Sequence, residues 1–61
     1  MKYTITRWRG EYLEYADETS CGWTYLSDCA MTFPTYQKAY YMAKKLNDRY
    51  GRKIVSVVRV D

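Results

Sequence analysis

The spacing of apolar and polar residues predicts a β-hairpin at the start of the chain. Residues 2–8 alternate between two faces, one of which carries Tyr3 and Ile5, and they are rich in residues that favour strands. Gly10 then interrupts the pattern and supplies the positive φ that a tight turn often needs. Residues 11–15 resume an extended pattern, so we expect the two segments to pair.

A polar loop and a third strand are predicted next. Residues 17–20 form a polar cluster with the composition of a surface loop. Residues 29–33 predict a short strand whose core anchor is Phe33. Residues 23–26 are compatible with a strand of their own or with an ordered loop that crosses the sheet.

Residues 35–51 predict an amphipathic helix of about four turns. Thr35 follows Pro34 and is the expected N-cap, and Gly51 stands where a left-handed residue is favoured at the end of a helix. The predicted inner stripe contains Tyr36, Ala39, Met42, Ala43, Leu46 and Tyr50. The predicted outer face contains Gln37, Tyr41, Lys44, Lys45 and Asp48.

Residues 53–60 predict a final strand that is apolar on both faces. One face carries Ile54, Val58 and Val60, and the other carries Val55 and Val57. Apolar residues on both faces are typical of an interior strand. On an open edge this run would promote aggregation, and the residues that flank it as charged gatekeepers are Arg52, Lys53 and Arg59.

Together these elements predict a single α+β domain over residues 1–61. The sheet has three to four mostly antiparallel strands in the order β-β-β-α-β, and one amphipathic helix packs on one of its faces. The last strand is expected to pair beside the first and to run parallel to it, with the helix as the crossover.

The face of the sheet opposite the helix is the first candidate binding surface. It is expected to carry Thr4, Thr6, Trp8, Tyr12, Val55 and Val57. Either this face is a partner surface, in which Trp and Tyr are the contacts that matter most, or Trp23 and Tyr25 close it as a small second core.

Composition agrees with a folded domain. A chain of 61 residues forms one domain that buries about 60% of the surface of its unfolded form. Eight Tyr and two Trp supply apolar area that the few aliphatic residues lack. The sequence has neither a run of about 18 apolar residues nor an apolar segment near Met1, which predicts a soluble, cytoplasmic protein without membrane contact.

The sequence shows no pattern that is typical of catalysis or metal binding. With no His, two Cys do not make an ordinary four-ligand zinc site. Glu11 and Glu14 face opposite sides of a strand, and no glycine-rich phosphate loop or activated nucleophile is recognisable. We therefore predict no enzyme activity, no cofactor and no metal. Cys21 and Cys29 are expected to be small apolar fillers, with a disulfide across neighbouring strands as the alternative.

Charge is divided unevenly along the chain and suggests a second function. Residues 1–33 carry a net charge of −2 and residues 34–61 a net charge of +5. A basic helix face favours a small RNA- or DNA-binding protein whose contacts are Lys38, Tyr41, Lys44, Lys45 and Arg52. The competing explanation is solubility, because an overall charge of +3 is small for a dedicated nucleic-acid binder.

A pattern spread over nearly the whole chain resembles a known group of proteins. It consists of Tyr12-Leu13, Gly22-Trp23, Asp28, Ala30, Phe33, Thr35, Ala39 and a Val-rich last strand. In these residues the chain resembles many small uncharacterised proteins of bacteriophages and other mobile elements. The resemblance implies a host-takeover or anti-defence factor that binds one host protein. Lys38 departs from the pattern, because those proteins more often carry there the Glu of a capping box.

The first functional prediction is therefore a non-enzymatic binding protein, phage-encoded according to the resemblance, that modulates or inhibits one host protein by direct contact. Surplus aromatic and acidic residues in the first half of the chain favour this prediction. The expected contacts are Trp8, Tyr12, Glu14, Tyr15 and Trp23. A homodimer formed through the open sheet face or an edge strand is a further alternative.

Overall fold

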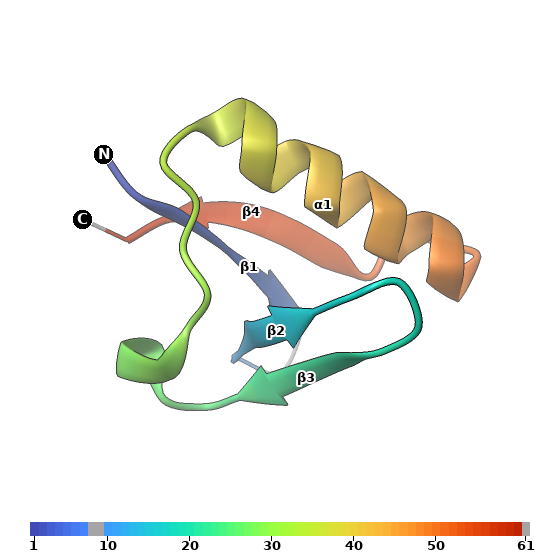
Figure 1. The fold of residues 1–61 in the computed structure, drawn as a ribbon, viewed down its shortest axis with the longest axis horizontal. Coiled ribbons are helices and arrows are strands. Elements are labelled where there is room, and N and C mark those ends of the chain that lie inside the picture. The colour runs from blue at the N-terminus through green and yellow to red at the C-terminus, as the bar shows by residue number, and fades with distance from the viewer. Residues whose placement is uncertain (8–9, 61) are drawn as a thin grey trace.

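The computed structural model describes residues 1–7 and 10–60 of the chain, and it is an antiparallel sheet with one helix on one side (Figure 1). The elements are β1 (Tyr3–Arg7), β2 (Glu11–Ala16), β3 (Cys21–Thr24), the short 3-10 helix η1 (Ser27–Cys29), α1 (Tyr36–Tyr50) and β4 (Val55–Arg59). The strands of this part of the chain form one four-stranded sheet in the order β3-β2-β1-β4, and every pair is antiparallel. The predicted α+β fold is confirmed.

The sheet opens between β1 and β2. These strands pair only next to their turn, through Thr6 with Tyr12 and Arg7 with Glu11. Beyond these two pairs the strands diverge, and residues 31–33 fill the space on the way from η1 to α1 (Figure 1). A segment without regular strand structure thus completes the sheet.

Backbone hydrogen bonds hold this segment on both sides. The Met31 N–H donates to the Leu13 carbonyl at 2.7 Å, and Tyr3 and Phe33 exchange two bonds of 3.0 and 2.8 Å. The Thr4 hydroxyl, which is fully buried, donates to the Met31 carbonyl at 2.6 Å. A buried hydroxyl requires such a partner, so this bond ties the Thr4 side chain to the segment.

The predicted third strand over residues 29–33 is wrong. The third strand is β3, which settles the open alternative for residues 23–26 in favour of extended structure as far as Thr24. Residues 27–29 instead form η1, in which the Cys29 N–H donates to the Leu26 carbonyl, and only Phe33 makes an isolated bridge to the sheet. The chain therefore crosses the sheet twice between β2 and α1, where the prediction counted one crossing.

The extra crossing reverses the direction of β4. β4 pairs with β1 as predicted but runs antiparallel to it, and Val57 lies opposite Ile5 and Val55 opposite Arg7. Val55 and Val57 therefore lie on the helix side of the sheet, and the prediction of the opposite face is wrong for both. The prediction of an interior strand is also wrong, because β4 is the last strand of the sheet.

The helix α1 begins and ends where the sequence predicts. The Thr35 hydroxyl accepts a hydrogen bond from the Lys38 N–H at 3.2 Å. Gly51 has a φ of 79°, and its N–H donates to the carbonyls of Asn47 and Asp48. Helix capping residues thus position the chain for the turn into β4.

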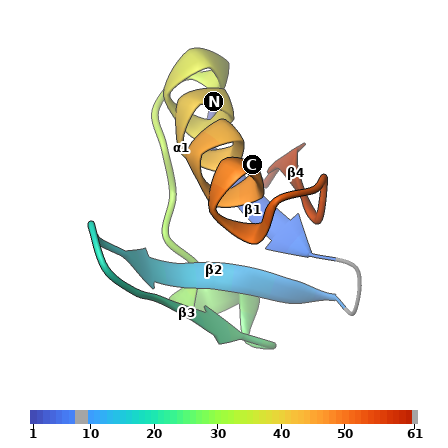
Figure 2. The same ribbon diagram turned by 90° about the vertical axis from the view of Figure 1, so that its right-hand side faces the viewer.

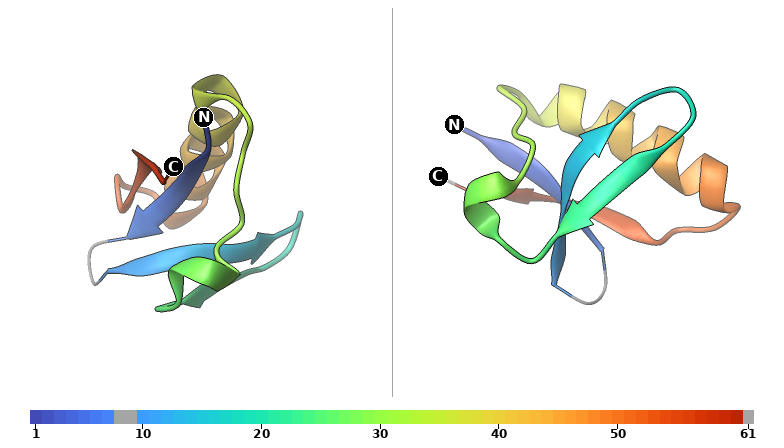
Figure 3. Two further views of the ribbon diagram at one scale, coloured as in Figure 1. Left: turned by 90° about the vertical axis from the view of Figure 1, so that its left-hand side faces the viewer. Right: turned by 60° about the horizontal axis from the view of Figure 1, so that its bottom comes forward.

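The core lies between α1 and the sheet. It consists of Ile5, Leu13, Phe33, Ala39, Ala43, Leu46 and Val55. α1 packs on β1 and β4, while β2 and β3 extend away beneath it (Figure 2). The start of β1 and the end of β4 lie side by side (Figure 3), where the Val60 N–H donates to the Lys2 carbonyl at 2.9 Å.

Two predictions, one about the inner stripe of α1 and one about the cysteines, have mixed outcomes. Within the predicted inner stripe of α1, Tyr36 is 53% and Tyr50 37% exposed, although the buried residues of the stripe follow the predicted spacing. Both cysteines are free thiols. Cys21 packs partly against the core as expected, whereas Cys29 is exposed in η1, so the prediction of an apolar filler is wrong for Cys29.

Candidate functional site

The residues predicted to contact a protein partner do not share one surface. Tyr12 and Tyr15 point to the face of the sheet away from α1, and Tyr15 is half exposed. Glu14 is exposed at an irregularity of β2. Trp23 lies on the opposite, helix-facing side. Trp8 lies outside the described residues. The structure therefore brings together only part of this set.

Trp23 has a structural role in the hydrophobic core. It pairs with Leu13 and packs against the core, and the guanidinium carbon of Arg7 lies 4.5 Å from the centre of its ring. Arg7 in turn donates two hydrogen bonds to the Glu11 carboxylate, of 2.7 and 3.3 Å, and these bonds raise the pKa of Arg7. The alternative in which Trp23 and Tyr25 close the outer face as a small second core is wrong, since Trp23 lies on the helix-facing side and Tyr25 is largely exposed to solvent.

The basic residues predicted for nucleic acid are exposed but divided between two places. Lys38 and Tyr41 line a shallow hollow on the outer surface of α1. Lys44 and Arg52 line a larger groove on the β4 side of the helix. Lys45 is exposed on α1 and lines neither.

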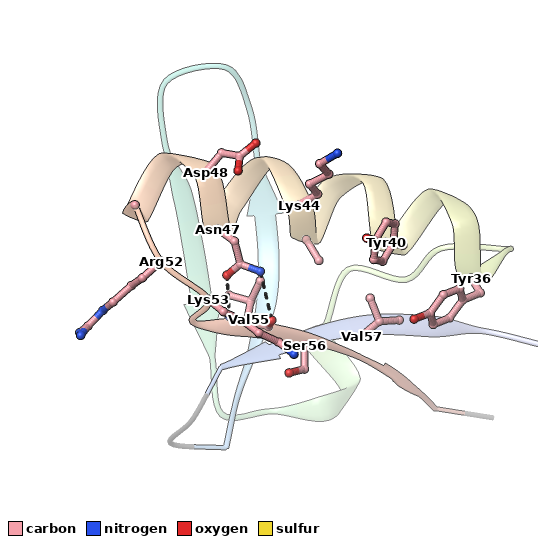
Figure 4. A pocket seen from close by; sticks show the side chains of 12 residues that line it. Tyr36, Tyr40, Lys44, Asn47, Asp48, Arg52, Lys53, Val55, Ser56 and Val57 are labelled. Carbon is pink, nitrogen blue, oxygen red and sulfur yellow. Dashed lines mark hydrogen bonds between the residues drawn. The ribbon is translucent and has the colours of Figure 1, made fainter.

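The larger hollow is an open groove of about 710 Å³ between α1 and β4 (Figure 4). α1 contributes Tyr36, Tyr40, Ala43, Lys44, Asn47 and Asp48, β4 contributes Val55, Ser56 and Val57, and the turn between them contributes Gly51, Arg52 and Lys53. The groove exists because α1 crosses above the last strand of the sheet, and no further strand lies beyond β4 within the described residues.

The outer edge of β4 faces this groove with unpaired backbone groups. In an antiparallel pair, alternate residues direct their N–H and C=O groups toward the partner strand and away from it. The Val60 bond to Lys2 marks Val58 and Ser56 as residues that bond to β1. Val57 therefore directs its N–H and C=O outward, and neither group has a hydrogen-bond partner among residues 1–7 and 10–60.

Asn47 closes one end of this edge. Its side-chain oxygen accepts from the Ile54 N–H at 2.7 Å. The same oxygen accepts from the Val55 N–H at 3.0 Å, and the side-chain nitrogen donates to the Val55 carbonyl at 3.4 Å (Figure 4). Val55 is almost fully buried, so these bonds satisfy groups that water reaches poorly. The open stretch of the β4 edge consequently begins after Val55.

Aromatic rings and positive charge line the groove. Tyr40 is 54% exposed and stacks on Tyr36 at 6.1 Å between ring centres, and both rings line the groove. Among the residues that the structure describes, the charged side chains that line the groove are Lys44, Arg52, Lys53 and Asp48. The groove is therefore positive and partly apolar, a combination typical of peptide and nucleic-acid sites.

Lys44 and Arg52 were predicted as contacts from the sequence, whereas the groove was not. The run of valines flanked by charged gatekeepers could have indicated the groove, because such a run is typical of an edge strand as well as of an interior one. Asn47 had no comparable signal, because an Asn near the end of a helix is common for many reasons.

Comparisons with protein-family models, with curated proteins and with solved structures find no match to this chain. The resemblance to phage proteins therefore stays a prediction. Within the described residues, no group of three or more His, Cys, Asp or Glu is placed to hold a metal ion. In the same part of the chain no helix has the length and apolar character needed to cross a membrane.

Proposed function

We propose that the protein is a non-enzymatic binding protein that docks on one partner protein through the groove between α1 and β4. The observation that carries this proposal is the unpaired N–H and C=O of Val57 beside an open, tyrosine-lined groove. An exposed strand edge is a template for another extended chain. The resemblance to phage proteins makes a protein of the host cytoplasm the expected partner, which the chain would modulate or inhibit by contact.

Two neighbouring tyrosines provide a matched test of this site. Tyr40 lines both the groove and the outer hollow of α1, whereas Tyr41, the next residue, is 69% exposed and lines only the outer hollow. Replacement of either ring by Ala removes the same atoms from the helix surface. The two variants therefore differ mainly in whether the groove has also lost an aromatic contact.

The experiment is a pull-down from a bacterial host lysate with the wild type, Tyr40→Ala and Tyr41→Ala. We expect the wild type and Tyr41→Ala to retain one protein in stoichiometric amount and Tyr40→Ala to retain much less of it. Circular dichroism of all three proteins controls for folding. The proposal fails if no stoichiometric protein is retained, or if Tyr40→Ala retains as much as the wild type.

A small RNA- or DNA-binding protein is the second candidate, and a different observation favours it. Tyr36, Tyr40 and Tyr41 surround the outer hollow of α1 together with Lys38, and exposed rings beside a base are suited to stacking with nucleobases. A mobility shift of single-stranded oligonucleotides at about 50 mM salt, lost at higher salt and in Tyr41→Ala, would support it. Absence of a shift under these conditions removes this candidate.

A further inference from the structure

We infer that the β4 edge binds an extended acidic segment of a partner protein, which adds to the sheet as a fifth strand beside Val57. This inference rests on the proposed function and names the chemistry of the partner at the same site. It follows from the backbone geometry of the edge, from the charges that line the groove and from the position of Asn47.

The backbone of β4 selects an extended peptide. Val57 offers a donor and an acceptor side by side on the outer edge, which match the C=O and N–H of one residue of an added strand. A nucleic-acid phosphate offers only acceptors, so it would bond to the N–H and be repelled by the neighbouring C=O. The edge therefore favours a polypeptide over a nucleic acid.

The side chains of the groove select an acidic sequence. Side chains alternate along a strand, so every second residue of an added strand would point toward α1 and into the groove. There it would meet Lys44, Arg52 and Lys53, with Asp48 as the only acid that lines the groove in the described part of the chain. Alternate carboxylates would be attracted to these bases, and an apolar residue among them would contact the exposed ring of Tyr40.

The same charges act against a second copy of this chain as the occupant. Antiparallel self-pairing of two β4 edges would bring two sets of Lys44, Arg52 and Lys53 to one interface, and like charges across such a pair are destabilising. Asn47 already bonds to both outward groups of Val55 and so shortens the stretch that a second β4 strand would need. Self-association is thus the weaker alternative.

The test uses a fluorescent seven-residue peptide of alternating glutamate and valine, with a lysine-for-glutamate peptide as its control. Fluorescence anisotropy measures the affinity of each peptide for the full chain. We expect micromolar to millimolar binding of the acidic peptide, a loss with added salt and no measurable binding of the basic peptide.

Two double variants with the same change in net charge locate the site. Arg52→Glu with Lys53→Glu reverses the groove, and Lys38→Glu with Lys45→Glu reverses the outer face of α1, whose lysines do not line the groove. We expect the groove variant to bind the acidic peptide roughly tenfold more weakly than the outer-face variant. We also expect only the groove variant to gain affinity for the basic peptide.

Hydrogen exchange tests strand addition directly. The Val57 amide should exchange fast in the free protein and become protected when the acidic peptide is added, because its N–H points outward. The amides of Ser56 and Val58 already bond to β1 and serve as internal controls. Binding without protection of Val57 would overturn strand addition.

The remaining outcomes separate this inference from the proposed function. If the acidic peptide does not bind at about 1 mM, while lysate capture still depends on Tyr40, the inference is wrong and the proposed function stands. Equal binding of the acidic and basic peptides also overturns it. A dimer found by light scattering would overturn it too, if the double variant Arg52→Glu with Lys53→Glu changed the amount of dimer. A second copy of the chain would then occupy the edge. An oligonucleotide that competes for the groove would overturn it in favour of nucleic acid.

Discussion

Replacement of Asn47 by Ala should destabilise the protein through β4 and not through the helix. The Asn47 side chain makes three hydrogen bonds within the described residues, all to the backbone of Ile54 and Val55, which lie seven and eight positions further along the chain. In Asn47→Ala two N–H groups lose their acceptor and one carbonyl loses its donor. These groups are partly buried beside Leu46 and the core, so water replaces the lost bonds incompletely.

The expected loss is about 2 kcal/mol of the free energy of unfolding. Each net hydrogen bond contributes about 0.5–1.5 kcal/mol, and the bond of 3.4 Å counts least. Ala favours a helix over Asn by roughly 0.5 kcal/mol, which offsets part of the loss. For a domain of this size, about 2 kcal/mol lowers the melting temperature by roughly 8–16 °C.

Urea unfolding followed by tryptophan fluorescence measures this change. An unchanged m value would show that the two proteins expose the same surface on unfolding, so that their stabilities can be compared. Asn47→Asp keeps the side-chain oxygen that accepts two bonds and should lose less than Asn47→Ala. Asp48→Ala is the matched control, because its exposed side chain makes no hydrogen bond within the described residues, and it should stay within about 0.5 kcal/mol of the wild type. A stability of Asn47→Ala within that same margin would refute the reasoning.

Three further changes test local features by the same urea measurement. Thr35→Ala removes the acceptor for the Lys38 N–H and should cost about 1 kcal/mol, whereas Thr35→Ser should cost much less; equal losses would contradict the cap. Gly51→Ala should cost about 1 kcal/mol because φ is 79°, although nothing lies within 4 Å of the added carbon, and Gly51→Asn should cost less; an unchanged midpoint for Gly51→Ala would contradict this strain. The backbone N–H groups of Thr19 and Ser20 lower the pKa of Asp17, so its contribution should be complete above the ordinary value of 3.8 and be lost as the pH falls through the lower pKa of the folded state. The wild type should therefore lose stability relative to Asp17→Asn below that pH, and parallel pH profiles would exclude this contribution.

Local features of this fold follow from nearest neighbours in the sequence. Thr35 and Gly51 delimit α1 because capping depends on the side chain or the φ of the residue itself. The positions of Ala39, Ala43 and Leu46 follow from the helical period, and those of Ile5 and Leu13 from strand alternation. These features need no knowledge of the rest of the molecule.

The location of the third strand and the direction of β4 do not follow from local sequence patterns. Residues 21–24 and 29–33 are both short and contain apolar residues. Which of them becomes a strand depends on which pairs with a neighbouring strand in the folded protein. Phe33 forms a backbone bridge with Tyr3 only because β1 and β2 diverge. One additional crossing of the sheet then reverses β4 and places Val57 on the helix side.

The candidate site likewise combines local features with features that depend on contacts between distant segments. Exposure of Lys44 and Arg52 follows from local sequence alone, since the outward face of an amphipathic helix and a turn are both solvated. Their position in one groove with Tyr40, the closure of its end by Asn47 and the outward backbone groups of Val57 depend on the folded arrangement. Hydrogen-bond pairing and strand order are relations between segments distant along the chain, so an edge is defined only when all the other strands are in place.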